Sequence, residues 1–288
     1  MNATPLWYWI AERHRIYRTR QAGKPWPWTQ DKILQDFRFC NVFRELDAVT
    51  IWIREHIREP YAEHPNLWFM LCLARQIGHP ATLQELIATG RAWPRTGAWS
   101  PGHAVAALDA RKRRGEQVYT GAYMLRGDIA YGGSKHPYTI YTVCGSLWQH
   151  RSEFARLFDA PAAPSLRAVH RWFLRFHGWG GFMAYEVVTD LRHTRYLQHA
   201  PDTHTWANAG PGAIRGLNRL AGRSLTFPLK QDRANEEMRE LLRESRTRLP
   251  RGFPTLEMRD IEHSLCETDK YLRVQNGEGR PRSRYRHD

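Results

Sequence analysis

Apolar side chains recur along most of the chain at the three- and four-residue spacing of amphipathic helices. Thr29 is a suitable N-cap for a long helix, because Asp31 then lies in its first turn and interacts favourably with the helix dipole. No proline or glycine interrupts the chain from there to about Ile57. A glycine- and tyrosine-rich stretch at 119–138 is expected to be a loop or a short hairpin, so the predicted fold class is all-α. Further helices are predicted at residues 66–77, 82–89, 100–114, 139–158, 165–176, 182–194, 212–220, 233–246 and 256–273.

The composition adds a strong positive charge to this pattern. Lys and Arg number 43 against 29 Asp and Glu, which gives a formal net charge of +14 and a pI near 10.0. Such an excess favours a polyanionic partner and supplies salt-sensitive affinity for phosphates, so DNA, RNA and anionic membrane surfaces all fit it. No run of 18 apolar residues occurs and residues 1–10 do not resemble a signal peptide, so no membrane partner is predicted.

The cysteines and tryptophans restrict the class of protein further. The four cysteines are scattered and form no CxxC pair, which argues against a structural zinc site and against a disulfide scaffold, and fits a reducing cytoplasm. The twelve tryptophans are expected mainly in the core, although aromatic platforms for bases also use them.

Residues 176–184 read FHGWGGFMA and resemble the hairpin that grips DNA in helix-hairpin-helix DNA glycosylases. Gly178, Gly180 and Gly181 are predicted to contact the DNA backbone, because glycine permits a close approach and helix-start amides bind phosphate. Asp202 follows eighteen residues after Ala184, the interval that such glycosylases use. The alternative is a helix corner in which glycine only allows close packing. Phe182 stands where bifunctional glycosylases carry a lysine, so the resemblance does not extend to a Schiff-base lyase.

This resemblance predicts one helical catalytic domain at residues 1–275, with two lobes around a cleft for DNA and a flipped base. The lobes are expected to comprise roughly residues 1–130 with 225–275, and residues 139–224. Residues 276–288 are basic, contain glycine and proline and lack apolar anchors. They are predicted to form a flexible tail unless DNA orders them.

Several polar residues are candidates for chemistry, and each also has a simpler structural interpretation. Asp202 either caps a helix containing Trp206 or serves as a carboxylate at the mouth of a base pocket, and His204 either shares that role or bonds the backbone. Gly210-Pro211-Gly212 with Arg215 and Arg219 forms either an anion site or a packing turn with solvated arginines. Two further helix faces fit substrate contact or plain surface polarity: Arg38, Asn41 and Glu45 on the first, and Arg259, Glu262, Cys266 and Asp269 on the last.

A nucleotide-binding kinase loop is not predicted. Residues 132–137 read GGSKHP, which is too short and wrongly spaced for a Walker A motif.

Five segments resemble a phage family first described as α-glutamyl/putrescinyl-thymine pyrophosphorylases and now as amino acid:DNA transferases, which shares the helical domain of 5-hydroxymethyl-deoxyuridine DNA kinases. The resemblance implies a reaction in the cytoplasm of the infected bacterial host. There, a free amino acid or other amine attacks duplex DNA whose 5-hydroxymethyl uracil has been pyrophosphorylated by a separate kinase, and pyrophosphate leaves. Glycine, serine, glutamate and putrescine are donors in the family, and the sequence does not choose among them. The segments are residues 16–20 (IYRTR), 27–31 (PWTQD), 39–47 (FCNVFRELD), 206–213 (WANAGPGA) and 262–267 (EHSLCE).

The needs of this reaction assign roles to the candidate residues. A base must deprotonate the amine, and Asp202 is the first choice, with His204 or Glu262 as substitutes. The flipped uracil needs stacking and edge contacts, for which Asn41, Trp206 and Asn208 are the candidates. Direct displacement and ionisation through an exocyclic methide both fit. The departing pyrophosphate is expected to be stabilised, with or without Mg²⁺, by Arg38, Arg44, Arg215 and Lys270.

Two other functions fit the same sequence. A glycosylase would cleave a modified thymine with the help of Asp202 and would leave abasic sites without any need for an amine. A non-catalytic DNA-binding accessory of the kinase would retain all activity of the system after Asp202→Asn.

Overall fold

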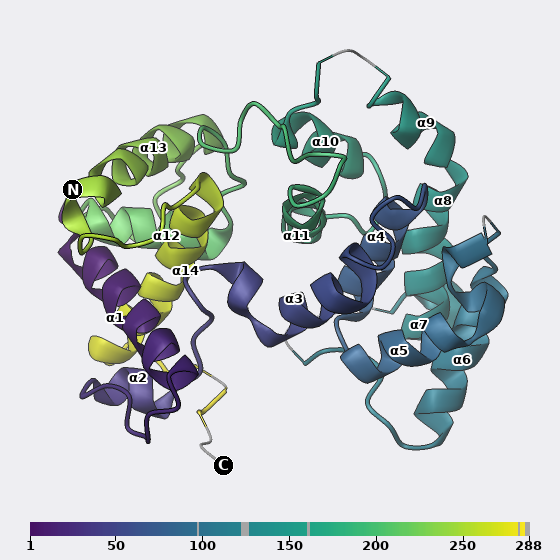
Figure 1. The fold of residues 1–288 in the computed structure, drawn as a ribbon, viewed down its shortest axis with the longest axis horizontal. Coiled ribbons are helices and arrows are strands. Elements are labelled where there is room, and N and C mark those ends of the chain that lie inside the picture. Colours follow the sequence, from purple (N-terminus) through teal and green to yellow (C-terminus); the bar gives the residue numbers. More distant parts are fainter. Residues whose placement is uncertain (97, 122–126, 160–161, 282, 286–288) are drawn as a thin grey trace. The chain divides into compact units, whose positions relative to one another are not determined.

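The computed structural model describes residues 1–288 except 97, 122–126, 160–161, 282 and 286–288 (Figure 1). Over this part of the chain the secondary structure is helical, and β-pairing is limited to one isolated bridge between Phe37 and Arg284. The expectation of an all-helical chain is confirmed. None of the described helices combines the length and the apolar character that crossing a bilayer requires.

The chain folds into two compact units, and each is described separately. Unit 1 comprises residues 1–47 and 202–288, and unit 2 comprises residues 48–201. These bounds differ from the lobes expected from the sequence. Residues 48–113 belong with the helices at 135–191 because α4 packs against α11, and residues 202–224 join unit 1 because α12 packs against α14.

In unit 1, α14 is the central helix and contacts α1, α2, α12 and α13 (Figure 1). Ile261 and Leu265 on the apolar side of α14 are buried, and α1 contributes Trp9 and Ile10 to the core. The helices of unit 1 are α1 (Thr4–Gln21), α2 (Lys32–Asp36), a 3₁₀ turn (Arg44–Leu46), α12 (Pro211–Leu220), α13 (Gln231–Arg248) and α14 (Met258–Gln275).

In unit 2, α4 is the core helix, and all eleven of its residues are buried. Arg75 lies in this helix and is neutralised by α11, where its Nε is 2.6 Å from Asp190 Oδ2 and its Nη1 is 3.5 Å from Glu186 Oε2. Unit 2 contains α3 (Ala48–Ile53) with a π turn (Arg54–Arg58), α4 (Leu67–Ile77), α5 (Pro80–Ala88), 3₁₀ turns (Gly90–Ala92, Pro94–Thr96), α6 (Pro101–Arg113), a 3₁₀ turn (Ile129–Tyr131), α7 (Lys135–Pro137), a π turn (Tyr138–Cys144), α8 (Gly145–Gln149), α9 (Arg151–Arg156), α10 (Leu166–Phe173) and α11 (Gly181–Leu191).

The long helix predicted from Thr29 to about Ile57 is wrong. Asp31, not Thr29, is the N-cap of α2, and its carboxylate accepts the backbone amides of Ile33 and Leu34. The helix ends at Asp36, and the chain then runs through an irregular segment until α3 begins at Ala48. Arg38, Asn41 and Glu45 therefore do not share a helix face. The side chains of Asp31 and Asp47 accept hydrogen bonds from nearby backbone amides. Such bonds from short polar residues commonly compete with helix formation.

The helices with clear boundary residues are confirmed to within a few residues. Ser100 and Ser165 cap α6 and α10 through their side chains, and Pro211 begins α12. The helix α1 is an addition to the predicted elements. Within the stretch expected to be a loop or hairpin, residues 122–126 lie outside the described part.

Candidate functional site

The segment at residues 37–47 of unit 1 is held in shape by Asn41 and Asp47. Asp47 Oδ1 accepts hydrogen bonds from the backbone N of Asn41 at 2.9 Å and from its Nδ2 at 3.1 Å. The same Nδ2 donates to Leu46 O at 2.7 Å. Asn41 is 9% exposed, and its Oδ1 is buried without a hydrogen-bond partner in the described residues. The amide nitrogen of Asn41 thus shapes this loop, and only the oxygen is left for the predicted contact with a base.

This loop is fastened to α14 by Glu267. The carboxylate of Glu267 accepts the backbone amide of Cys40 at 3.0 Å and pairs with Lys270 Nζ at 2.8 Å. Lys270 Nζ also lies 4.6 Å from the centroid of the Phe39 ring, a cation–π contact. Arg13 of α1 donates from Nη2 to Phe39 O at 3.4 Å. Lys270, predicted to bind pyrophosphate, therefore belongs to a partly buried ionic cluster.

Cys40, Asp47 and His263 meet beside this cluster. One side-chain N, O or S atom from each lies within 4.8 Å of the others. Arg44 bridges two of them, with Nη1 3.4 Å from Cys40 Sγ and Nε 3.3 Å from Asp47 Oδ2. Burial raises the pKa of the Cys40 thiol to about 12, and it also raises the pKa of the Asp47 carboxyl, although Arg44 opposes the second shift. We call Cys40, Asp47, His263, Glu267 and Lys270 the polar centre.

Glycines let α12 pack closely on α14. A Cβ at Gly212 would stand 2.3 Å from Cys266 Sγ, and a Cβ at Gly216 would stand 2.5 Å from Leu265 O. The backbone N of Gly210 donates to Glu262 Oε1 at 3.1 Å. Gly210-Pro211-Gly212 is thus a packing turn whose first amide already has a carboxylate partner, and Glu262 is fixed next to the start of α12.

The two arginines of α12 bind a buried acid. Arg215 Nε lies 2.9 Å from Asp269 Oδ2, and Arg219 Nε lies 2.7 Å from Asp269 Oδ1. Arg219 also pairs with Glu278. Asp269 was expected on a polar face of the last helix, where its i,i+4 spacing to Arg273 suggests a surface pair. The pair exists, with Arg273 Nε 3.9 Å from Asp269 Oδ2, but the Asp269 side chain is only 1% exposed. The Arg215 side chain remains 40% exposed, so it can still meet an anion.

Asp202 and His204 lie in a turn at residues 201–205 and not in a capped helix. The backbone oxygen of Asp202 accepts the amides of Thr205 at 3.0 Å and Trp206 at 2.9 Å. The turn is fastened to α13 and α14, because Arg239 donates to Thr205 O and the Met258 amide donates to Thr203 O. Asp202 is half-buried and His204 is exposed. Trp206 is buried and Asn208 is half-buried, and the roles assigned to these four residues stay predictions.

The glycine hairpin in unit 2 joins α10 to α11. Gly178 has φ +80°, and a Cβ there would stand 2.5 Å from Val143 Cγ2, so this position requires glycine for both its conformation and its packing. The indole N–H of Trp179 anchors the turn on Val143 O at 2.9 Å. Gly180, the residue before α11, would place a Cβ in open space. The turn is thus packed at Gly178 and open at Gly180.

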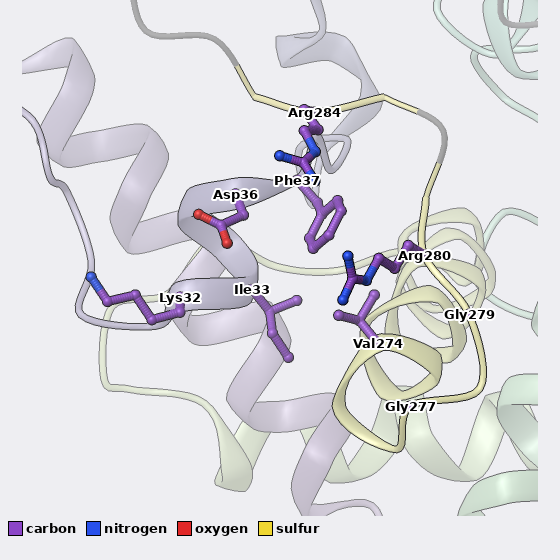
Figure 2. Close-up of a pocket in the computed structure, with 9 residues that line it drawn as sticks. All are labelled: Lys32, Ile33, Asp36, Phe37, Val274, Gly277, Gly279, Arg280 and Arg284. Atoms are coloured by element: carbon purple, nitrogen blue, oxygen red, sulfur yellow. The ribbon is translucent and has the colours of Figure 1, made fainter.

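A cationic pocket of about 390 Å³ lies in unit 1 between α2, the end of α14 and the residues beyond it (Figure 2). Phe37, Ile33 and Val274 supply its apolar lining, and the Arg280 side chain extends toward Phe37 and Val274. Its charged residues are Lys32, Arg280 and Arg284 against the single acid Asp36.

The segment that closes this pocket was expected to be a flexible tail. In the structure the Arg38 amide donates to Ser283 O at 3.1 Å and the Tyr285 amide donates to Asp36 O at 2.9 Å, while the flexibility of the tail stays a prediction. The exposed Arg38 thus lies next to the tail, whose basic character was noted from the sequence but whose place beside α2 was not predicted.

The chain was compared with known proteins. A family model described as "5-hmdU DNA kinase, helical domain" matches residues 2–280. The chain belongs to this helical-domain family. A 5-hmdU DNA kinase of Bacillus phage SP10 is 28% identical over 287 residues, which cover 91% of this chain and 44% of that relative. The chain therefore spans less than half the length of this curated kinase. No solved structure matches.

The family match extends through both units of the helical domain and includes every candidate site residue. Sequence reasoning did not single out several residues of the polar centre. His263 and Asp47 had been noted only as members of two family-like segments, residues 262–267 and 39–47. Neither has a local spacing signal, because the two approach each other only when the 37–47 loop folds onto α14.

Proposed function

We propose that this helical domain acts on duplex DNA carrying pyrophosphorylated 5-hydroxymethyl uracil and transfers an amine to the 5-methylene carbon, with release of pyrophosphate. Membership of the 5-hmdU DNA kinase helical-domain family supports a role in hydroxymethyluracil modification. Within this domain, no phosphoryl transfer is assigned to the GGSKHP stretch at residues 132–137, because it does not have Walker A spacing.

The polar centre is the observation that carries the proposal. A domain that only packs against a partner has no need to gather a thiol, two carboxylates, an imidazole and an ammonium group at partly buried positions. Perturbed ionisable groups concentrate at functional sites, and in the polar centre burial raises the pKa values of Cys40 and Asp47. This concentration favours catalysis over a purely structural role.

The general base is the residue that takes the proton from the attacking ammonium. Asp202 remains the first choice, because its turn is fixed on α13 and α14 and its side chain is half-buried. Glu262 is a positioned substitute, since its Oε1 accepts the Gly210 amide at 3.1 Å, and the exposed His204 is the third candidate. Once deprotonated, the amine nitrogen forms a bond to the methylene carbon as the carbon–oxygen bond to pyrophosphate breaks.

The leaving group needs positive charge where the bond breaks. Lys270, Arg44 and Arg215 each form an ion pair with an acid of the same unit, and these pairs orient the three side chains. The N–H donors that the pairs do not use are proposed to bind the pyrophosphate. The exposed Arg38 is the fourth predicted cation and adjoins Phe37 of the cationic pocket. Mg²⁺ bound to the pyrophosphate is compatible with this assignment.

Contact with DNA and with the flipped base is assigned to separate residues. The amides at the start of α11, with the open Gly180 in front of them, suit a phosphate of the backbone. Trp206, Asn208 and the unpaired Oδ1 of Asn41 are proposed to hold the uracil.

A second candidate function is that of a non-catalytic helical accessory of the kinase. It is favoured by the match of this chain to only 44% of a 5-hmdU DNA kinase. Such a domain would hold DNA for a separate catalytic domain and would leave the modified base unchanged by itself.

Mass analysis of nucleosides distinguishes these functions. Wild-type protein is incubated with pyrophosphorylated 5-hydroxymethyl-uracil DNA and a panel of amino acids and polyamines, beside Asp202→Asn and Glu262→Gln. An amine adduct that one of these variants loses, while its DNA binding persists, supports the transferase and identifies the base. Release of a free base would instead indicate a glycosylase, and unchanged DNA with every amine would support the accessory role.

A further inference from the structure

We propose that Cys40, Asp47 and His263 form a binding site for one divalent transition-metal ion of the zinc class. The three side chains come from two sides of unit 1, the 37–47 loop and α14, and their sulfur, oxygen and nitrogen atoms lie within 4.8 Å of one another. This inference does not depend on the proposed amine transfer.

The donor set selects the kind of metal. A thiolate, an imidazole and a carboxylate together suit Zn²⁺ or Co²⁺, whereas Mg²⁺ and Ca²⁺ prefer oxygen ligands alone. Zinc–ligand bonds of about 2.0–2.3 Å place tetrahedral ligands roughly 3.5 Å apart. The three atoms therefore need to close by only about 1 Å, which rotamer adjustments of partly buried side chains can supply.

The groups around the three ligands already orient them. The backbone N and the Nδ2 of Asn41 both donate to Asp47 Oδ1, and these two hydrogen bonds fix the orientation of the carboxylate. Oδ2 is buried and accepts no hydrogen bond among the described residues, although it forms an ion pair with Arg44. Glu267 fixes the backbone of Cys40 through its amide. Hydrogen bonds of this kind, made by the ligand residues to their neighbours, are typical of metal sites.

The guanidinium of Arg44 is a cation that already lies between two of the ligands, Cys40 and Asp47. It lies 3.4 Å from Cys40 Sγ and 3.3 Å from Asp47 Oδ2, so it partly neutralises this pair. A metal ion must turn the guanidinium aside, which costs affinity. Removing Arg44 should therefore strengthen metal binding, because it removes a competitor for the same two atoms.

The other charges that face the site are Arg13, Lys270 and Glu267. A divalent ion held by three protein ligands keeps a fourth position for water or an anionic oxygen. Beside Arg13 and Lys270, that position suits an oxygen of a phosphate or pyrophosphate. Because metal binding must displace the proton of the Cys40 thiol, uptake should release a proton and weaken as the pH falls.

The test uses the full, tag-free chain loaded with Zn²⁺ or Co²⁺ alone and then passed over a desalting column. We expect about one equivalent of metal by elemental mass spectrometry, and a thiolate-to-cobalt absorption band with Co²⁺. Cys40→Ser and His263→Gln should lose the band and bind metal at least roughly tenfold more weakly, whereas Arg44→Gln should bind more tightly.

Cys266→Ser is the matched control, because Cys266 is another half-buried cysteine of unit 1 that is not one of the three ligands. It should keep the metal and the band. Failure of the wild type to retain metal or to show the band would overturn the proposal, as would equal binding by Cys40→Ser and Cys266→Ser. Should Cys40→Ser not fold, as judged by circular dichroism, His263→Gln and the wild-type cobalt spectrum decide the matter.

Discussion

Asp269 Oδ1 lies 2.7 Å from Arg219 Nε, so a buried carboxylate of α14 holds an arginine of α12. The same carboxylate binds Arg215 through its other oxygen. We expect Asp269→Asn to destabilise unit 1 by about 2–3 kcal/mol, because the largely buried guanidinium of Arg219 then keeps only Glu278 as a counter-charge. Chemical denaturation followed by circular dichroism measures this loss.

Glu236→Gln provides the control for that experiment. Glu236 pairs with Arg233 on α13, and both side chains are about half exposed. The free energy of unfolding should change by no more than about 0.5 kcal/mol. Equal losses for Asp269→Asn and Glu236→Gln would contradict the view that the α12–α14 pairing stabilises the fold.

The glycine hairpin allows stability and DNA binding to be tested separately. Gly180 has φ −82° and open space around its missing Cβ, but it is the N-cap of α11, where alanine is less favourable than glycine. The two effects oppose each other, so Gly180→Ala should change the free energy of unfolding by less than about 1 kcal/mol. A methyl group there would obstruct a phosphate at the start of α11. We therefore expect duplex affinity to fall roughly tenfold, about 1.4 kcal/mol.

Gly178→Ala is the contrasting variant. Its φ of +80° and the overlap with Val143 predict a loss of about 1–3 kcal/mol in the free energy of unfolding. Fluorescence anisotropy with a labelled duplex and thermal unfolding give both quantities. Unchanged DNA affinity of Gly180→Ala would count against phosphate binding by this hairpin.

Asp260 predicts a specific pH dependence of stability. Burial raises its pKa from 3.8 to about 7, although its hydrogen bond from the Glu257 amide opposes the shift. The folded state then keeps a proton that the unfolded state has lost. The associated stability is fully present below about pH 4 and is lost as the pH rises to about 7, on the order of 3–4 kcal/mol.

Asp260→Asn isolates this contribution, because its amide oxygen can still accept from Glu257 without titrating. Urea unfolding between pH 4 and pH 8 should show the wild type losing stability relative to this variant as the pH rises. Parallel curves for the two proteins would show that Asp260 does not titrate in this range.

Local signals allowed much of the helical order to be predicted. Ser100, Ser165 and Pro211 mark helix starts through chemistry confined to one turn, so α6, α10 and α12 could be located from the sequence. The unbroken stretch after Thr29 misled the prediction, because Asp31 and Asp47 bind nearby backbone amides and divide it.

The partners of the candidate site could not be predicted in the same way. Asp269 and Arg273 have the spacing of an exposed pair, and only the packing of α12 on α14 shows that Asp269 is buried and also binds Arg215 and Arg219. Cys40 and His263 are likewise brought together only by the tertiary fold. The sequence provided the residue types of the site, whereas their pairing depends on contacts between distant segments.

The most direct test of the proposed function counts pyrophosphate and amine adducts in the same reaction. Pyrophosphorylated 5-hydroxymethyl-uracil DNA is incubated with the wild-type protein and an isotopically labelled amine panel, and both products are quantified. The proposed transfer predicts one pyrophosphate released for each labelled nucleoside formed. It also predicts no labelled product from one of the two variants, Asp202→Asn or Glu262→Gln, namely the one that lacks the general base. Release of free base, or DNA that stays unchanged with every amine, would contradict it.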